Sequence, residues 1–163
     1  MGYILAADGK KFSKRSGNAV SPDGVVNHFG ADAFRLYEMF IGPFESTAPW
    51  STNGLVGTRR FIERVWRISQ NVERESQNQK SNKNLKTILH KTIKKVSEDV
   101  SVFKFNTAVS TLMICLNEFE RAREQGIVSR EDFITFLKLL APFAPHVTEE
   151  LYQSLHVTRS TLH

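Results

Sequence analysis

This sequence lacks the features that mark secreted, disulfide-bonded or membrane-spanning proteins. Among its 163 residues there is a single cysteine, Cys115, which excludes an internal disulfide and is typical of a reducing compartment. Cys115 lies in an apolar stretch, so we expect a core thiol rather than a nucleophile. No apolar run is long enough to cross a bilayer, and residues 1–5 show no signal-peptide pattern. We therefore expect a cytoplasmic protein with no membrane partner.

Metal-site and nucleotide-fold signatures are missing as well. The histidines lack the paired spacing of metal ligands, and no cysteine or carboxylate completes such a set, so no metal site is expected. There is also no glycine-rich nucleotide fingerprint and no internal repeat. His146 directly follows Ala144-Pro145, and we expect it to hold a helix start through hydrogen bonds rather than to act as an acid or base.

Strand signals are confined to the start of the chain. The apolar run 3–6, the turn pair Asp8-Gly9 and the returning residues 10–12 predict a short β-hairpin. Beyond it, apolar residues recur at intervals of three and four, as Phe61, Val65 and Ile68 do, which predicts helices. The expected fold is mainly α: a helical bundle preceded by a short β-hairpin and a basic loop.

Two prolines and weak periodicity in residues 43–50 predict a domain boundary there. We expect residues 1–49 to form the loop with its adjoining helices, and residues 50–163 to form the bundle. Three serines are predicted to start helices, because serine at an N-cap can accept a backbone hydrogen bond: Ser21, Ser51 and Ser129. Ser21 is followed by Pro22, which suits the first helical position.

The loop after the predicted hairpin is strongly basic. Lys10, Lys11, Lys14 and Arg15 surround a turn that also contains Ser13, Ser16 and Gly17. Ammonium groups and hydroxyl donors on a glycine-containing loop suit a polyphosphate whose charge moves during a reaction. A basic surface loop can equally be only solvated. The net charge of +5 favours an anionic partner without specifying which one.

The residues around this loop carry a resemblance to a known family. The segment Lys11-Phe12-Ser13-Lys14-Arg15 resembles the Lys-Met-Ser-Lys-Ser signature of class I aminoacyl-tRNA synthetases, with Phe12 in place of Met and Arg15 in place of the last Ser. Phe12 keeps a bulky apolar anchor, whereas Arg15 replaces a hydroxyl with a charge. Further stretches resemble the leucyl-tRNA synthetases in the family's order: residues 16–23, 29–37, 42–51, 60–67, 105–109 and 140–152.

The resemblance implies an enzyme that uses ATP, with Mg²⁺, to activate leucine and transfer it to tRNA(Leu). By their match to the signature, Lys14 is implied to be the main pyrophosphate ligand and Lys11 its partner, with Ser13 also in the ATP-binding set. Phe12 is implied to be the apolar anchor, and Gly17 to supply freedom of the loop.

The face formed by Arg60, Arg64 and Arg67 is open to two interpretations. It can be a solvated edge with ion pairs to Glu63 or to a neighbouring helix, or, as the resemblance suggests, it can contact tRNA phosphates. Base-specific anticodon reading is not expected, and the protein is expected to be a monomer.

The family's nucleotide-binding domain, its His-Ile-Gly-His-type motif and its editing domain would all precede Gly2. We therefore expect this chain to be a piece that is inactive alone. The alternatives are a non-enzymatic helical RNA-binding or scaffold module, and a piece of a valyl-, isoleucyl- or methionyl-tRNA synthetase.

Overall fold

The computed structural model describes residues 2–13, 15–74 and 83–157. Within these ranges the chain forms seven helices and two very short strands, so the mainly α-helical class is confirmed. In chain order they are β1 (Ile4–Leu5), α1 (Pro22–Phe29), α2 (Ala31–Phe40), β2 (Ala48–Pro49), α3 (Thr52–Arg74), α4 (Lys83–Ser101), α5 (Phe105–Glu124), α6 (Arg130–Leu140) and α7 (Pro145–Val157).

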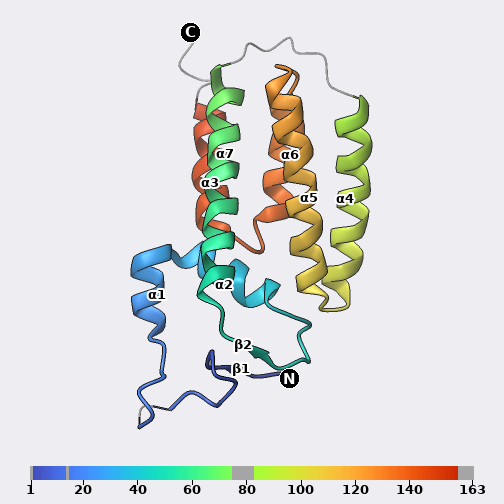
Figure 1. The fold of residues 1–163 in the computed structure, drawn as a ribbon. Helices are drawn as coiled ribbons and strands as arrows, with labels where there is room; N and C mark the ends of the chain where they lie inside the picture. The colour runs from blue at the N-terminus through green and yellow to red at the C-terminus, as the bar shows by residue number, and fades with distance from the viewer. Residues whose placement is uncertain (1, 14, 75–82, 158–163) are drawn as a thin grey trace.

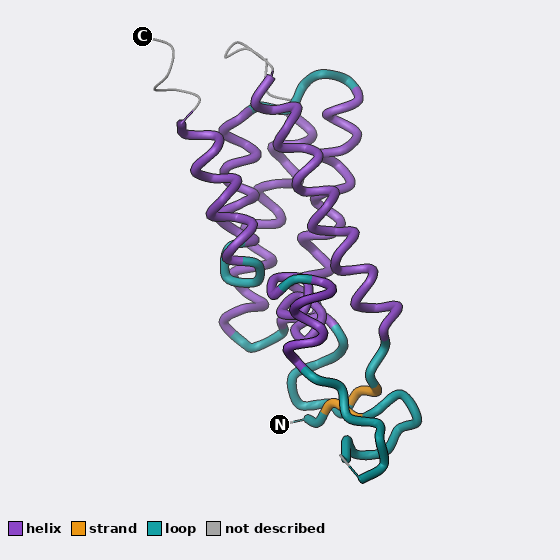
Figure 2. The backbone as a smooth tube through the Cα atoms, turned by 90° about the vertical axis from the view of Figure 1, so that its left-hand side faces the viewer, coloured by secondary structure: helices purple, strands orange, loops and turns teal. Residues whose placement is uncertain are grey.

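Helices α3 to α7 stand side by side as an elongated bundle, with α2 across its base and α1 to one side (Figure 1). Helix α4 packs on α5, and α2 contacts α3, α5 and α7. The two strands and the basic loop extend from the same end of the bundle, as the rotated view shows (Figure 2). The basic loop is therefore held at one end of a rigid helical body.

The core of the bundle consists of the apolar stripes predicted from the sequence. On α3, Phe61, Val65 and Ile68 are at most 2% exposed. Phe119 of α5 contacts the rings of Phe133 and Phe136 on α6, with centroids 5.7 and 5.2 Å away. Burying each such side chain contributes about 1.5–3 kcal/mol, so packing rather than local propensity holds the helices together.

The predicted helix starts are largely as the sequence indicates. Ser51 Oγ accepts a hydrogen bond from the Gly54 amide at 3.2 Å, and Ser129 Oγ accepts one from the Asp132 amide at 3.1 Å. Ser21 occupies the N-cap position of α1, with Pro22 at the first helical position, but its side chain makes no capping bond.

The predicted β-hairpin is wrong. The Asp8-Gly9 turn forms, with the Ala6 amide donating to the Lys10 carbonyl at 2.8 Å, but β1 pairs in parallel with β2, not with residues 10–12. The Trp50 amide donates to the Leu5 carbonyl at 2.7 Å, directly after β2. An isolated two-stranded pair is unstable in water. The pairing with residues 48–50 also places the large Trp50 ring against Phe34 and Tyr37 on α2.

Helix α2 contributes to the same core as the later helices. Ala33 and Leu36 are fully buried within the main apolar cluster, and Thr58 Oγ1 on α3 donates to the Ala33 carbonyl at 2.9 Å. The division of the chain at residues 49 and 50 stays a prediction.

Candidate functional site

The basic loop is closed by a single side chain, Asn18. Its Oδ1 accepts a hydrogen bond from the Ser13 amide at 2.8 Å, and its Nδ2 donates to the Lys11 carbonyl at 3.3 Å. Gly17 has a φ of 66°, a left-handed conformation that glycine adopts without a steric penalty. Sequence reasoning missed the role of Asn18, although an asparagine beside a glycine is a common device for closing a turn.

Phe12 anchors the loop to the bundle. Its half-buried ring lies edge-on to the Trp50 indole, with centroids 6.5 Å apart. Trp50 in turn lies edge-on to Phe34 at 6.2 Å and to Tyr37 at 5.0 Å, both on α2. Such edge-to-face pairs contribute about 0.5–1.5 kcal/mol each beyond burial. Phe12 thus contacts an aromatic cluster at the base of the bundle, and Trp50 is the partner that the sequence did not identify.

Tyr37 helps to hold Trp50 in place. Its hydroxyl oxygen accepts a hydrogen bond from the Ser51 amide at 2.6 Å, and its side chain is fully buried. Burial raises the pKa of Tyr37 above its usual value, and the nearby Glu38 adds to this, although the Ser51 hydrogen bond opposes it. The phenol therefore stays neutral at ordinary pH and serves as a structural support.

The polar and charged residues of the signature differ in their exposure and contacts. Lys11 is exposed, and its Nζ lies 5.7 Å from the centroid of the Tyr3 ring, a cation–π contact. Arg15 is exposed, and Ser13 is half-buried. Lys14 lies outside the described residues. The structure brings Lys11, Ser13 and Arg15 onto one loop, and their roles stay predictions.

The predicted face of Arg60, Arg64 and Arg67 on α3 is not uniform. Arg64 makes two hydrogen bonds to the carboxylate of Glu120 on α5, at 2.8 and 2.6 Å, and one to Asn117 at 2.6 Å. The hydrogen bond to Arg64 lowers the pKa of Glu120, and the same contact raises the pKa of Arg64. Arg60 and Arg67 are exposed. Arg64 thus joins two helices, while the other two cations face solvent.

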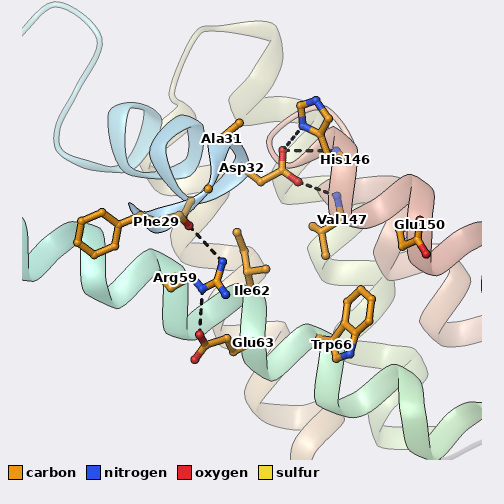
Figure 3. Close-up of a pocket in the computed structure, with 12 residues that line it drawn as sticks. Phe29, Ala31, Asp32, Arg59, Ile62, Glu63, Trp66, His146, Val147 and Glu150 are labelled. Atoms are coloured by element: carbon orange, nitrogen blue, oxygen red, sulfur yellow. Dashed lines mark hydrogen bonds and ion pairs between the residues drawn. The ribbon is translucent and has the colours of Figure 1, made fainter. Parts of the chain in front are cut away.

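A groove of about 560 Å³ lies between α2, α3 and α7 (Figure 3). At its rim Asp32 on α2 accepts a hydrogen bond from the Val147 amide at 2.7 Å and contacts His146 Nδ1 at 2.8 Å. A carboxylate at the first turn of a helix satisfies its unpaired amides, so Asp32 caps α7 from another helix. The prediction that His146 holds a helix start is confirmed. Its hydrogen-bond partner is Asp32, which the sequence did not identify. Trp66, 42% exposed, lies along the same groove.

Other chemistry is limited in the described part of the chain. No group of three or more histidine, cysteine, aspartate or glutamate side chains in that part could hold a metal ion. Burial raises the pKa of the Cys115 thiol to about 11, so this cysteine is a core thiol, as predicted. No helix within the described ranges is long and apolar enough to span a membrane.

Comparisons with known proteins agree with this geometry. The family "Anticodon-binding domain of tRNA ligase" matches residues 82–163, and the family "tRNA synthetases class I (I, L, M and V)" matches residues 1–47. A leucine–tRNA ligase of Alkaliphilus oremlandii is 47% identical over 94% of this chain and 18% of that protein. One of Chlorobium chlorochromatii is 48% identical over 99% of this chain and 20% of that protein.

A solved structure shows the same similarity in three dimensions. The crystal structure of the Agrobacterium radiobacter K84 agnB2 LeuRS–tRNA–LeuAMS ternary complex matches with a TM-score of 0.82 and 30% identity. The match covers 94% of this chain and 22% of that one. The chain thus belongs to the class I tRNA synthetases that carry this anticodon-binding domain. Within that class, the proteins it resembles at 47–48% identity are leucine–tRNA ligases. It spans 18–20% of the length of these curated relatives.

Proposed function

We propose that this chain is the part of a leucine–tRNA ligase that stabilises departing pyrophosphate and supports the tRNA. The observation that carries the proposal is the 47% identity to a leucine–tRNA ligase along 94% of the chain, which includes the basic loop and the bundle together. In this proposal residues 1–49 supply the loop with its adjoining helices, and residues 50–163 form the tRNA-binding bundle. ATP, leucine and tRNA(Leu) are the substrates of the complete protein.

The chemical difficulty lies in the first half of the reaction. A carboxylate oxygen of leucine attacks the α-phosphorus of ATP, and the bond to the bridging oxygen of the β-phosphate breaks. Pyrophosphate leaves with the bonding electrons, and leucyl-adenylate remains. A hydroxyl of the terminal adenosine of tRNA then attacks the activated carbonyl and releases AMP. Negative charge therefore accumulates on the departing pyrophosphate in the first step.

Lysines on a movable loop suit this step. A cation that contacts pyrophosphate more strongly in the transition state than in bound ATP lowers the barrier, whereas equal contact would only tighten binding. Lys14 takes this role with Lys11 as its partner, and Ser13 lies in the same ATP-binding set. The Asn18 hydrogen bonds and the Phe12–Trp50 contact define the base from which such a loop would act.

The bundle supports the tRNA through its phosphates. Arg60 and Arg67 are exposed on α3 and suit this task, and Arg64 belongs to the same proposed tRNA-binding set through its place on the helix. Because phosphate contacts release counterions, the binding weakens as salt is raised. The complete protein would act in the cytoplasm as a monomer, with ATP taken up together with Mg²⁺.

The test is aminoacylation by the complete protein. Purified protein, ATP and total tRNA are incubated with leucine, valine, isoleucine or methionine in separate reactions. Leucine charging at least about 100-fold faster than the others is expected, because synthetases separate similar amino acids by such factors. Preferred charging of another amino acid would assign the chain to that synthetase. Binding of RNA with no charging at all would favour the non-enzymatic module.

The isolated chain offers a second test. The nucleotide and leucine sites are proposed to lie in the rest of the protein, so this chain alone should not catalyse leucine-dependent ATP–pyrophosphate exchange. Exchange above the no-enzyme background by the purified chain would contradict this division of labour.

A further inference from the structure

The end of the bundle near Gly2 carries an exposed aromatic patch. Phe44 is 50% exposed and Phe103 is 62% exposed, and their rings stack with centroids 6.0 Å apart. Val102, 57% exposed, adds aliphatic surface beside them. Phe105 lies edge-on to both rings, at 6.2 and 5.9 Å. We refer to Phe44, Val102, Phe103 and Phe105 as the aromatic corner.

This corner is built into the fold rather than formed by loosely held side chains. Among the described residues Phe103 is the one non-glycine residue with positive φ, at 58°. This conformation is strained for a bulky side chain, and surrounding contacts must enforce it. The Lys104 amide donates to the Asp99 carbonyl at 2.8 Å, and the Asp99 carboxylate accepts from Lys95 Nζ at 2.6 Å and from Thr107 Oγ1 at 2.8 Å.

The positive φ of Phe103 ends α4, with the Phe103 amide donating to the Val100 carbonyl at 3.2 Å, and it leaves the Phe103 ring facing water. Soluble proteins seldom leave stacked aromatic side chains uncovered, and such patches mark surfaces that another element contacts. The corner also shows no excess of positive charge, since Glu45 and Lys104, adjacent in sequence to Phe44 and Phe103, carry opposite charges. Its chemistry fits an apolar polypeptide surface better than a phosphate backbone.

The place where the chain enters the fold identifies the occupant. The Gly2 amide donates to the Phe44 carbonyl at 3.2 Å, and a Cβ on Gly2 would collide with the Ser46 carbonyl oxygen. The backbone at Gly2 therefore lies directly beside Phe44. The curated relatives are several times longer, because this chain spans only 18–20% of them.

We propose that the aromatic corner is the docking surface for apolar side chains of the polypeptide that precedes Gly2 in the complete protein. The inference rests on the part of the proposed function that places this chain within a longer synthetase. Through the aromatic corner, this contact holds both the segment near the base of the basic loop and the turn between α4 and α5 against the same preceding part of the protein. It thereby fixes the bundle against the part of the protein in which the nucleotide is proposed to bind.

Hydroxyl-radical footprinting of the complete, unmodified protein tests this docking. The oxidation rates of Phe44 and Phe103 are measured by mass spectrometry in native protein and in the same protein unfolded by guanidinium. Ile114 on α5, 61% exposed, is the matched reference, and the unfolded rates correct for intrinsic reactivity. We expect Phe103 to be protected about fivefold more than Ile114, because the centre of a protein contact is fully buried.

Three outcomes would overturn the inference. The first is Phe44 and Phe103 reacting as fast as Ile114. The second is protection that appears only when tRNA is added, which would assign the corner to RNA. The third is protection that disappears on dilution, which would assign it to a second copy of the protein. Protection that is independent of both tRNA and concentration supports the proposal.

Pyrophosphate exchange on the same preparation separates this inference from the proposed function. If the protein activates leucine but Phe44 and Phe103 are not protected, the docking inference is wrong and the proposed function stands. Protected phenylalanines in a protein that activates a different amino acid remove the leucine assignment and leave the docking surface in place.

Discussion

Trp50 sets its indole ring edge-on to the phenyl ring of Phe12, with centroids 6.5 Å apart, and this contact joins the basic loop to the helical bundle. The Trp50 ring also contacts Tyr37 on α2, and the Trp50 amide donates to the carbonyl of Leu5, the last residue of β1. One residue thus links the loop, the strand pair and the core. A loop with a fixed base can move at its tip and still return to one position, which is what late contact with a leaving group requires.

Replacing Phe12 tests this link. Phe12→Met keeps an apolar side chain of similar size, so leucine-dependent pyrophosphate exchange by the complete protein should stay within about threefold. Phe12→Ser removes the ring that contacts Trp50. Because misplacing a catalytic group by about 1 Å can cost up to about 100-fold, exchange should fall by about 10–100-fold. Equal rates for the two variants would contradict the anchoring role of Phe12.

Local features of this structure were predictable from the sequence. The caps at Ser51 and Ser129 and the buried stripe of α3 each depend on residues a few positions apart. The resemblance to synthetases also located the basic loop. These features rest on turn and helix geometry, which short sequence patterns encode directly.

Contacts between distant residues were not predictable in this way. Asp32 caps α7 across 114 positions, and Arg64 reaches Glu120 across 56 positions. The parallel pairing of β1 with β2 also depends on where Trp50 packs. Without the tertiary arrangement, Arg64 looks equivalent to Arg60 and Arg67, and Asp8-Gly9 looks like an ordinary hairpin turn.

The Arg64–Glu120 contact should matter for stability. It is partly buried and has two hydrogen bonds, so Glu120→Gln should lower the free energy of unfolding by about 1–2 kcal/mol in urea titrations. Glu98→Gln is the matched control, because the Lys94–Glu98 pair is exposed and 3.9 Å long. It should change stability by no more than about 0.5 kcal/mol. Similar losses in both variants would argue against an interhelical role for Arg64.

The exposed arginines should matter for RNA. If Arg60 and Arg67 contact phosphates, replacing both with alanine lowers the affinity of the complete protein for tRNA(Leu). The slope of log K against log salt should fall by about 0.7–0.9 for each lost contact. Lys91→Ala, which removes an exposed cation from α4, should leave the slope unchanged. An unchanged slope in the double variant would mean that α3 does not contact the RNA.

Asp99 should make stability depend on acid pH. Burial by itself raises the pKa of Asp99, but hydrogen bonds from Lys95 and Thr107 and the nearby charges outweigh it, so the pKa lies below its usual value. At acid pH the folded protein therefore binds fewer protons at Asp99 than the unfolded chain does. The ionised carboxylate thus stabilises the fold above the ordinary aspartate pKa of 3.8. This stabilisation is lost as the pH falls through the lower folded pKa.

The comparison of Asp99→Asn with the unchanged protein isolates this effect. Near neutral pH the free energy of unfolding of the variant should be lower by about 1–3 kcal/mol, because charged hydrogen bonds are lost. The difference should shrink as the pH falls from the ordinary aspartate pKa through the lower folded value, where the original side chain also becomes neutral. A difference that stays constant down to the lowest pH at which both proteins are folded would contradict the lowered pKa.

The most direct measurement of the central claim uses Lys14→Ala in the complete protein. Pyrophosphate exchange reports adenylate formation, and equilibrium dialysis reports leucine binding in the same preparation. Losing one charged contact to the leaving group should slow exchange by about 100–1,000-fold and change the leucine dissociation constant by less than about threefold. Lys10→Ala, outside the five-residue signature and paired with Asp8 at 3.9 Å, should behave as the unchanged protein. Exchange by Lys14→Ala at the rate of the Lys10→Ala protein would contradict the account.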